Sequence, residues 1–164
     1  MFFLPGVLLG IDAELAAAAL MNFRSAGMRQ KVVKFRKMTV IEDCYNASPD
    51  SMRAAFHTLV HQEGGGRKIA VVGDMLELGS LSGEAHRFVG QLAKEYALDK
   101  LFVVGDFSEE VRAGAEGVDC SVFPDNQSLA EELLRYIQPE DVILFKASRG
   151  VRLEEVLERL YEEY

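Results

Sequence analysis

The sequence is poor in cysteine and short of positive charge, and each shortage excludes a class of protein. Cys44 and Cys120 are the only two cysteines in 164 residues, which excludes a small scaffold held together by disulfides. Both are flanked by residues typical of strands, so we expect them to be reduced and buried in a cytosolic protein. With 18 Lys and Arg against 26 Asp and Glu, the net charge of −8 argues against general binding to nucleic acid or anionic membranes. Any anion site must therefore be a local basic pocket.

Long apolar runs and export signals are also missing. Residues 1–10 are apolar but contain Pro5 and no basic leader, and the apolar run from Leu15 to Met21 is far shorter than the roughly 20 residues of a bilayer span. We therefore expect a cytoplasmic chain without a membrane anchor. A hydrophobic content of 49% with 27% charged residues is typical of a globular domain that buries its own core.

Several widespread catalytic patterns are absent as well. The triple glycine 64–66 with Arg67 and Lys68 is not a phosphate-binding P-loop, because no Ser or Thr follows the lysine. No G-x-S-x-G motif occurs, and no Ser/His/Asp triad can be named. His57 and His61 lie one helical turn apart, but no H-E-x-x-H pattern or cysteine pair accompanies them. We interpret them as surface histidines and expect no metal site.

What the sequence does contain is a regular alternation of short β-branched runs and helical patterns. The segments 69–74 and 101–106 are nearly identical and lie one strand-helix unit apart. We therefore predict an α/β fold: a Rossmann-like, doubly wound, mostly parallel sheet with helices on both faces. The expected elements are a helix over 10–23 with Asp12 as N-cap, a basic hairpin or linker over 24–37, strands over 38–45, 68–73, 100–105, 121–123 and 142–146, and helices starting at Ser48-Pro49, covering 82–96, capped by Ser108, ending near Ile137 and covering 151–164.

Polar segments follow the predicted strands, at the end where ligands of such sheets bind. The segment 43–48 offers a carboxylate, a phenol, an amide and a hydroxyl to an anion or a sugar, although Ser48 and Pro49 also simply start a helix. The segment 146–150 offers two cations and a hydroxyl to a phosphate or carboxylate, or is a solvated loop. The glycines of segment 73–79 serve a tight turn or a ligand contact.

Five segments, taken in order, resemble the C-terminal domain of a Mur ligase. They are Gly27-Met28-Arg29, the segment 43–52, the segment 73–79, His86 in the following helix, and Lys146-Ala147-Ser148-Arg149. Ala147 stands where the family's K-G-S-R motif has glycine, which leaves the path of that loop open. The resemblance implies that residues 28–164 form this domain, and that residues 1–27 are the terminal helix of a preceding ATPase domain and a linker.

The resemblance also implies a function. The motifs are most similar to those of family members that add D-alanyl-D-alanine to UDP-N-acetylmuramoyl-tripeptide through an acyl phosphate, with ATP and Mg²⁺ as cofactors. The family's P-loop and Mg²⁺ ligands lie in a central domain, so we expect this chain to be a fragment, inactive alone, that closes as a lid. The implied nucleotide-binding residues are Arg29, Asp43, Tyr45 and Asn46, and the implied substrate-binding residues are Ser48, Lys146, Ser148 and Arg149.

Two alternatives remain open. The first is a sister ligase that adds diaminopimelate or lysine, but such ligases have D-N-P-R or a variant after the strand that here ends in 105–108, and His in place of Asn46. Both differences favour the dipeptide-adding enzyme. The second is a free-standing, non-catalytic Rossmann-like module that binds a nucleotide or a partner. A P-loop encoded upstream of Met1 would favour the ligase.

Overall fold

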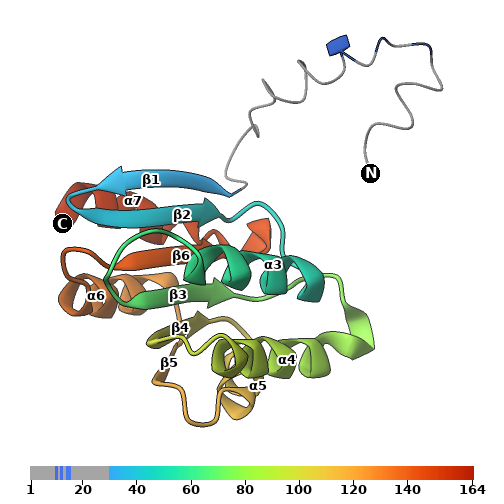
Figure 1. Ribbon diagram of the computed structural model, residues 1–164. Helices are drawn as coiled ribbons and strands as arrows, with labels where there is room; N and C mark the ends of the chain where they lie inside the picture. Colours follow the sequence, from blue (N-terminus) through green and yellow to red (C-terminus); the bar gives the residue numbers. More distant parts are fainter. Residues whose placement is uncertain (1–9, 11, 13, 16–29) are drawn as a thin grey trace.

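The computed structural model describes residues 10, 12, 14, 15 and 30–164, and from residue 30 onward the chain forms one sheet covered by helices (Figure 1). The sheet has six strands in the order β1-β2-β6-β3-β4-β5. The strands are β1 Lys31–Phe35, β2 Met38–Asp43, β3 Lys68–Gly73, β4 Lys100–Val104, β5 Cys120–Phe123 and β6 Val142–Lys146. The helices are α3 Pro49–Val60, α4 Ser82–Glu95, α5 Ser108–Gly114, α6 Asn126–Tyr136 and α7 Glu154–Glu163, with short 3-10 turns at Gly79–Leu81 and Arg149–Val151.

The sheet is mostly parallel, as predicted. Strands β2, β6, β3, β4 and β5 pair in parallel, and only β1 is antiparallel, to β2. The two nearly identical segments form the neighbouring strands β3 and β4. The basic stretch of the sequence forms a hairpin rather than a linker where the structure describes it. Its turn is Arg36-Lys37, whose φ angles of 43° and 68° suit a two-residue hairpin turn.

Helices cover both faces of the sheet and create two separate cores. In β3, Ala70 and Val72 pack on the side of α3, α4 and α5, whereas Ile69 and Val71 pack on the side of α6 and α7. Figure 1 shows α3 and α4 in front of the sheet and α6 and α7 behind it. Because successive side chains of a strand point to opposite faces, strands buried on both sides consist of continuous apolar runs. The prediction of a doubly wound α/β fold is therefore confirmed.

The predicted start of α3 is confirmed. Ser48 Oγ accepts a hydrogen bond from the backbone N–H of Ser51 at 3.4 Å, and Ser51 Oγ accepts one from the N–H of Ser48 at 2.9 Å. Pro49, which has no N–H to satisfy, follows at the first helical position. The helix is therefore fixed at the carboxyl end of β2.

The prediction that Ser108 caps a helix is wrong. Ser108 is the first residue of α5, and its side chain makes no capping hydrogen bond. Asp74, which follows β3, instead fixes the loop before α5, because its carboxylate accepts the backbone N–H groups of Asp106 at 2.8 Å and Phe107 at 3.2 Å. A side chain from a neighbouring strand thus holds the loop from which α5 begins.

The last helix begins three residues later than predicted. Residues Arg149–Val151 form a 3-10 turn, and Arg152 adopts a left-handed conformation with φ of 57°. An α-helix cannot pass through a left-handed residue, so α7 begins at Glu154. At the other end of the chain, Asp12 Oδ1 accepts the N–H groups of Glu14 and Leu15, as expected of an N-cap. The remainder of the predicted helix over 10–23 lies outside the described residues.

The two cysteines are free thiols in different environments. Cys44 is buried, as predicted, and burial raises the pKa of its thiol to about 12. Cys120 is only half-buried, contrary to the prediction, and burial raises its thiol pKa to about 11. Both thiols therefore stay protonated at neutral pH. None of the helices in the described part of the chain could span a bilayer.

Helices α4 and α5 pack closely because two glycines face each other across their contact. A Cβ on Gly90 would overlap the Val111 carbonyl, and one on Gly114 would overlap the Arg87 carbonyl. We expect Gly90→Ala to lower the free energy of unfolding by about 1–3 kcal/mol, measured by urea titration.

Gly83→Ala, in the same helix, is the matched control. The nearest atom to a Cβ at Gly83 is Glu110 Cγ, at 3.9 Å, so this change should leave stability within about 0.5 kcal/mol of the unaltered chain or raise it slightly. Equal losses from the two substitutions would contradict the close packing.

Candidate functional site

The carboxyl ends of the five parallel strands lie at one edge of the sheet. Strands β2, β6, β3 and β4 are parallel neighbours, so the segments 43–48, 146–150, 73–79 and 105–108 come together there. These are the polar segments that the sequence places after its strands. The edge is therefore the candidate functional site of the chain.

At the centre of this edge lies a buried ion pair. Asp43 and Lys146 are opposite residues in the pairing of β2 with β6, and they are only 6% and 1% exposed. Lys146 Nζ donates to Asp43 Oδ2 at 2.7 Å and to the backbone oxygen of Asn46 at 2.9 Å. The ion pair thus ties the turn after β2 to the end of β6.

All the predicted site residues that the structure describes line two adjoining pockets. A pocket of about 240 Å³, here called the ion-pair pocket, contains Asp43 and Lys146. A pocket of about 370 Å³, here called the arginine pocket, contains Arg149. Asn46 belongs to both. The ion-pair pocket is lined by Gln30, Asp43, Asn46, Ser48, Ser51 and Lys146, and the arginine pocket by Tyr45, Asn46, Leu76, Glu77, Ser148, Arg149 and Gly150.

Arg29 is the one predicted site residue that lies outside the described residues. Its neighbour in the sequence, Gln30, lines the ion-pair pocket. The continuously described part of the chain, residues 30–164, therefore begins at the pocket where Asp43 and Lys146 lie.

The arginine pocket combines a cation with an aromatic ring. The Arg149 guanidinium carbon is 5.7 Å from the centroid of the Tyr45 ring, and both residues are exposed. A guanidinium binds carboxylates and phosphates through paired hydrogen bonds, and an aromatic face packs against a flat or apolar group. This pocket is therefore suited to an anionic group attached to an organic ligand.

The loop after β6 is fixed by the turn after β3. Ser148 N–H donates to the backbone oxygen of Asp74 at 3.0 Å, and Ser148 Oγ accepts from the N–H of Leu76 at 2.9 Å. Ala147 is fully buried beside Gly73, where an added Cβ would lie 3.0 Å from the Ala147 methyl. Because Gly73 leaves that space, the loop accommodates alanine where the K-G-S-R motif has glycine.

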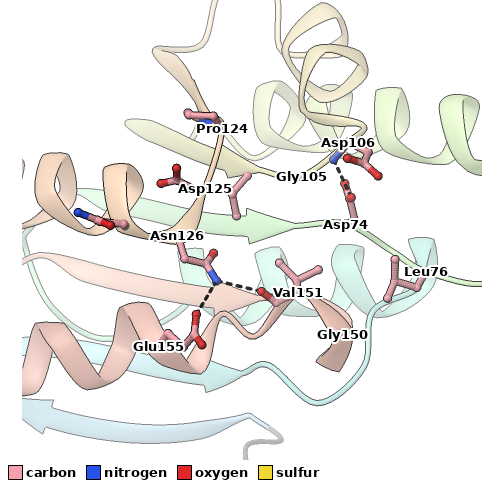
Figure 2. Close-up of a pocket in the computed structure, with 12 residues that line it drawn as sticks. Asp74, Leu76, Gly105, Asp106, Pro124, Asp125, Asn126, Gly150, Val151 and Glu155 are labelled. Atoms are coloured by element: carbon pink, nitrogen blue, oxygen red, sulfur yellow. Dashed lines mark hydrogen bonds between the residues drawn. The ribbon is translucent and has the colours of Figure 1, made fainter.

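A third pocket, of about 600 Å³, lies next to the arginine pocket and shares Leu76 and Gly150 with it (Figure 2). Its charged lining residues among those described are all acidic: Asp74, Asp106, Asp125 and Glu155. Figure 2 shows Asn126 donating to the Val151 carbonyl, at 2.9 Å, and to Glu155, at 3.3 Å. We call this hollow the acidic pocket, and its charge favours a cationic group.

Segment 124–127 lines part of the acidic pocket, although it is not among the site segments predicted from the sequence. This segment follows β5 at the same edge of the sheet, and Asp125 caps α6 by accepting the N–H of Ser128 at 2.8 Å. That hydrogen bond holds the pKa of the Asp125 carboxyl below its usual value. The signal was a helix-capping residue shortly after a strand, as with Ser48 in segment 43–48.

His57 on α3 and His61 directly after it are exposed, as predicted. The His57 and His61 rings stack at 4.0 Å between centroids, and His61 Nδ1 lies 2.8 Å from the backbone oxygen of His57. Within the described residues, no group of three or more His, Cys, Asp or Glu side chains is arranged to hold a metal ion.

The sequence of this chain is similar to those of known proteins over most of its length. It is 36% identical over 162 residues to the UDP-N-acetylmuramoyl-tripeptide--D-alanyl-D-alanine ligase of Bacillus subtilis, covering 96% of this chain and 35% of that protein. The corresponding ligase of Synechocystis is 32% identical, covering 94% of this chain and 34% of that protein. The chain thus spans about a third of the length of these relatives.

Solved structures agree with the sequence comparison. A crystal structure of MurF from Acinetobacter baumannii matches 96% of this chain and 35% of its own, with a TM-score of 0.88 and 31% identity. The MurF ligase from Thermotoga maritima in complex with ADP matches 98% of this chain and 36% of its own, with a TM-score of 0.81 and 29% identity. The family model for the Mur ligase glutamate ligase domain matches residues 28–149. On the evidence of this match, which covers most of the chain, the protein belongs to the Mur ligase family.

Proposed function

We propose that this chain is part of an ATP-dependent ligase that adds D-alanyl-D-alanine to UDP-N-acetylmuramoyl-tripeptide in peptidoglycan precursor synthesis. Residues 28–164 would be its C-terminal domain, and residues 1–27 the end of a central ATPase domain with a linker. The observation that carries the proposal is the convergence of the described predicted site residues on two pockets that share Asn46. The names of the sequence relatives support the choice of substrates.

Four residues are proposed to bind the nucleotide. Arg29 would reach the ATP phosphates, Asp43 the ribose hydroxyls, and Tyr45 and Asn46 the remainder of the nucleotide. A carboxylate paired with a lysine still accepts hydrogen bonds from hydroxyl groups, and Asp43 lines the ion-pair pocket. The ADP bound by the similar Thermotoga protein supports a nucleotide in the full-length ligase.

Ser48, Lys146, Ser148 and Arg149 are proposed to bind the reacting groups or the dipeptide. A dipeptide carries a carboxylate and an ammonium group. Arg149 suits the carboxylate, and the acidic pocket next to it suits the ammonium group, so a zwitterion fits across the shared wall of Leu76 and Gly150.

The reaction needs positioning more than covalent catalysis by this domain. ATP transfers its γ-phosphoryl group to the tripeptide carboxylate, which forms an acyl phosphate and ADP. The dipeptide ammonium group first loses a proton to solvent. The free amine then attacks the acyl carbon, the bond to phosphate breaks, and the new amide nitrogen loses a second proton. Holding the amine near the acyl phosphate and neutralising the phosphate charge are the contributions that Arg149 and Lys146 would make.

ATP and Mg²⁺ are proposed to be held mainly by the part of the polypeptide outside this chain. The chain has no P-loop pattern, and it would act as a lid that completes the site when it closes. We also propose that the ligase works in the cytoplasm, where nucleotide-linked substrates and ATP are available.

The first experiment tests the substrate. The full-length ligase should consume ATP with the UDP-linked tripeptide and D-alanyl-D-alanine, and should not use diaminopimelate or lysine in place of the dipeptide. The 164-residue chain alone should show no ATP turnover and should not bind ADP with micromolar affinity in calorimetry, because the groups expected to bind Mg²⁺ and the γ-phosphate are absent from it. Preference for diaminopimelate or lysine would establish the sister ligase, and nucleotide binding without ligation would establish the non-catalytic module.

A second experiment separates the two roles of Asp43. In the full-length ligase, Asp43→Asn keeps an oxygen for Lys146 but removes the charge, and we expect the KM for ATP to rise about tenfold to a hundredfold. This range corresponds to charge-assisted hydrogen bonds worth about 1.5–3 kcal/mol. Asp43→Ala should in addition destabilise the domain by about 3–5 kcal/mol, because it leaves the buried Lys146 ammonium without the side-chain oxygen that the Asn variant still supplies.

Glu95→Gln is the control for the ion pair. It breaks the exposed pair of Arg53 with Glu95, which is 2.9 Å long, and should change neither the KM nor the melting temperature appreciably. A KM for ATP within about twofold of normal in Asp43→Asn would show that Asp43 is purely structural.

A third experiment tests Arg29. If Arg29 binds a phosphate through two of its guanidinium nitrogens, Arg29→Lys keeps the charge but loses the paired hydrogen bonds, and kcat/KM for ATP should fall about fivefold to 150-fold. Lys34→Ala is the control, since Lys34 Nζ donates to Thr39 Oγ1 within the β1–β2 hairpin at 2.7 Å. Equal small effects from both changes would leave only diffuse electrostatics and rule out a specific phosphate contact.

A further inference from the structure

His86 is a buried histidine that lines none of the three pockets. It lies on α4, is 1% exposed, and faces the turn that follows β3. Its Nε2 accepts the backbone N–H of Met75 at 2.9 Å, and its Nδ1 lies 2.6 Å from the backbone oxygen of Ser82. An N–H group requires an acceptor and a carbonyl requires a donor, so these contacts assign the hydrogen of the ring to Nδ1.

The ring is held in place from three elements. It stacks on Phe107 of the loop before α5, with centroids 4.7 Å apart and planes 18° apart. Its Nε2 lies 3.6 Å from Asp74 Oδ1, at the end of β3, and its Nδ1 bonds within α4. The position of Nε2 is therefore fixed by packing as well as by hydrogen bonds.

The turn that His86 holds also holds the loop of the arginine pocket. Met75 lies between two residues that bond to Ser148: Asp74 accepts the Ser148 N–H, and Leu76 donates to Ser148 Oγ. Ser148 directly precedes Arg149, and Leu76 itself lines both the arginine pocket and the acidic pocket. A displacement of Met75 would therefore move the wall shared by these two pockets.

We propose that His86 is a positioning residue for the dipeptide subsite: its neutral Nδ1–H form holds Met75 and thereby sets the places of Leu76, Ser148 and Arg149. This inference rests on the proposed ligase function. The Met75 residue is 1% exposed, so its N–H cannot turn to water if the acceptor is removed. The turn must then move until the N–H finds a partner, and it takes the Ser148 contacts with it.

Substitutions at His86 test this role in the full-length ligase. His86→Leu keeps most of the bulk but removes the acceptor, and it should lower kcat/KM for D-alanyl-D-alanine about tenfold while the KM for ATP stays within about twofold. His86→Gln places an oxygen near the position of Nε2 and should restore kcat/KM for the dipeptide to within about threefold of normal. His57→Leu, at an exposed histidine of the same domain, is the matched control and should change neither constant.

Hydrogen exchange of the 164-residue chain supplies a readout that does not need activity. The Met75 amide should exchange about tenfold faster in His86→Leu than in the unaltered chain or in His86→Gln, while the amides of Val71 and Leu144 in the sheet keep their rates. If His86→Leu does not fold, His86→Asn serves instead, because its side chain is too short to reach the Met75 N–H and should give the same losses.

Each result decides one question. A kcat/KM for the dipeptide within about threefold of normal in the Leu or Asn variant overturns the positioning role, and so does an equal loss in the Gln variant or unchanged exchange at Met75. If the unaltered ligase is inactive with the dipeptide, the proposed function is overturned instead. The exchange rate of the Met75 amide then tests only whether His86 holds the turn.

Discussion

The ion pair between the buried Lys146 ammonium group and the Asp43 carboxylate is the interaction on which the candidate site depends. A charge at the end of a central strand is unfavourable unless it is paired and hydrogen-bonded. Asp43 and the Asn46 carbonyl satisfy it, although they lie 103 and 100 positions away in the sequence. The same contacts fix the turn that carries Tyr45 and begins α3, so one ion pair sets the geometry of two pockets.

The sheet supplies the frame for that pair. Parallel strands buried on both faces need helices on each side, and α4 and α5 approach closely enough only because Gly90 and Gly114 lack side chains. Because β2, β6, β3 and β4 run parallel, the loops that follow them all lie at one edge of the sheet. On this edge the Arg149 guanidinium and an acidic region around Asp106 lie next to each other. Such neighbouring opposite charges suit a ligand that carries both an acid and an amine.

Much of this could be predicted from the sequence because it depends on local patterns. Alternating apolar runs and helix starts such as Ser48-Pro49 are determined by neighbours in the chain, and they predicted the strands, most helices and the fold class. The polar segments after the strands gave the residues of the ion-pair and arginine pockets. The hydrophobic patterns do not depend on which strands become neighbours.

The remaining features depend on contacts between distant segments. The insertion of β6 between β2 and β3 brings Lys146 to Asp43 and Ser148 to Asp74, and nothing local in the sequence specifies that order. For the same reason the hydrogen bonds of Asp74 to the loop before α5, the left-handed Arg152 and the space left by Gly73 for Ala147 became visible only in three dimensions. Segment 124–127 was missed because the acidic pocket requires β5 to lie beside β4.

The most direct test of a ligand site at this edge is a crystal structure of the full-length protein with the proposed ligands, a non-hydrolysable ATP analogue and D-alanyl-D-alanine. We expect the ribose hydroxyls within hydrogen-bonding distance of Asp43, and the dipeptide carboxylate on Arg149 beside the acidic pocket. Ligands that make no contact with the loops after β2, β6 and β3 would contradict this assignment of the site.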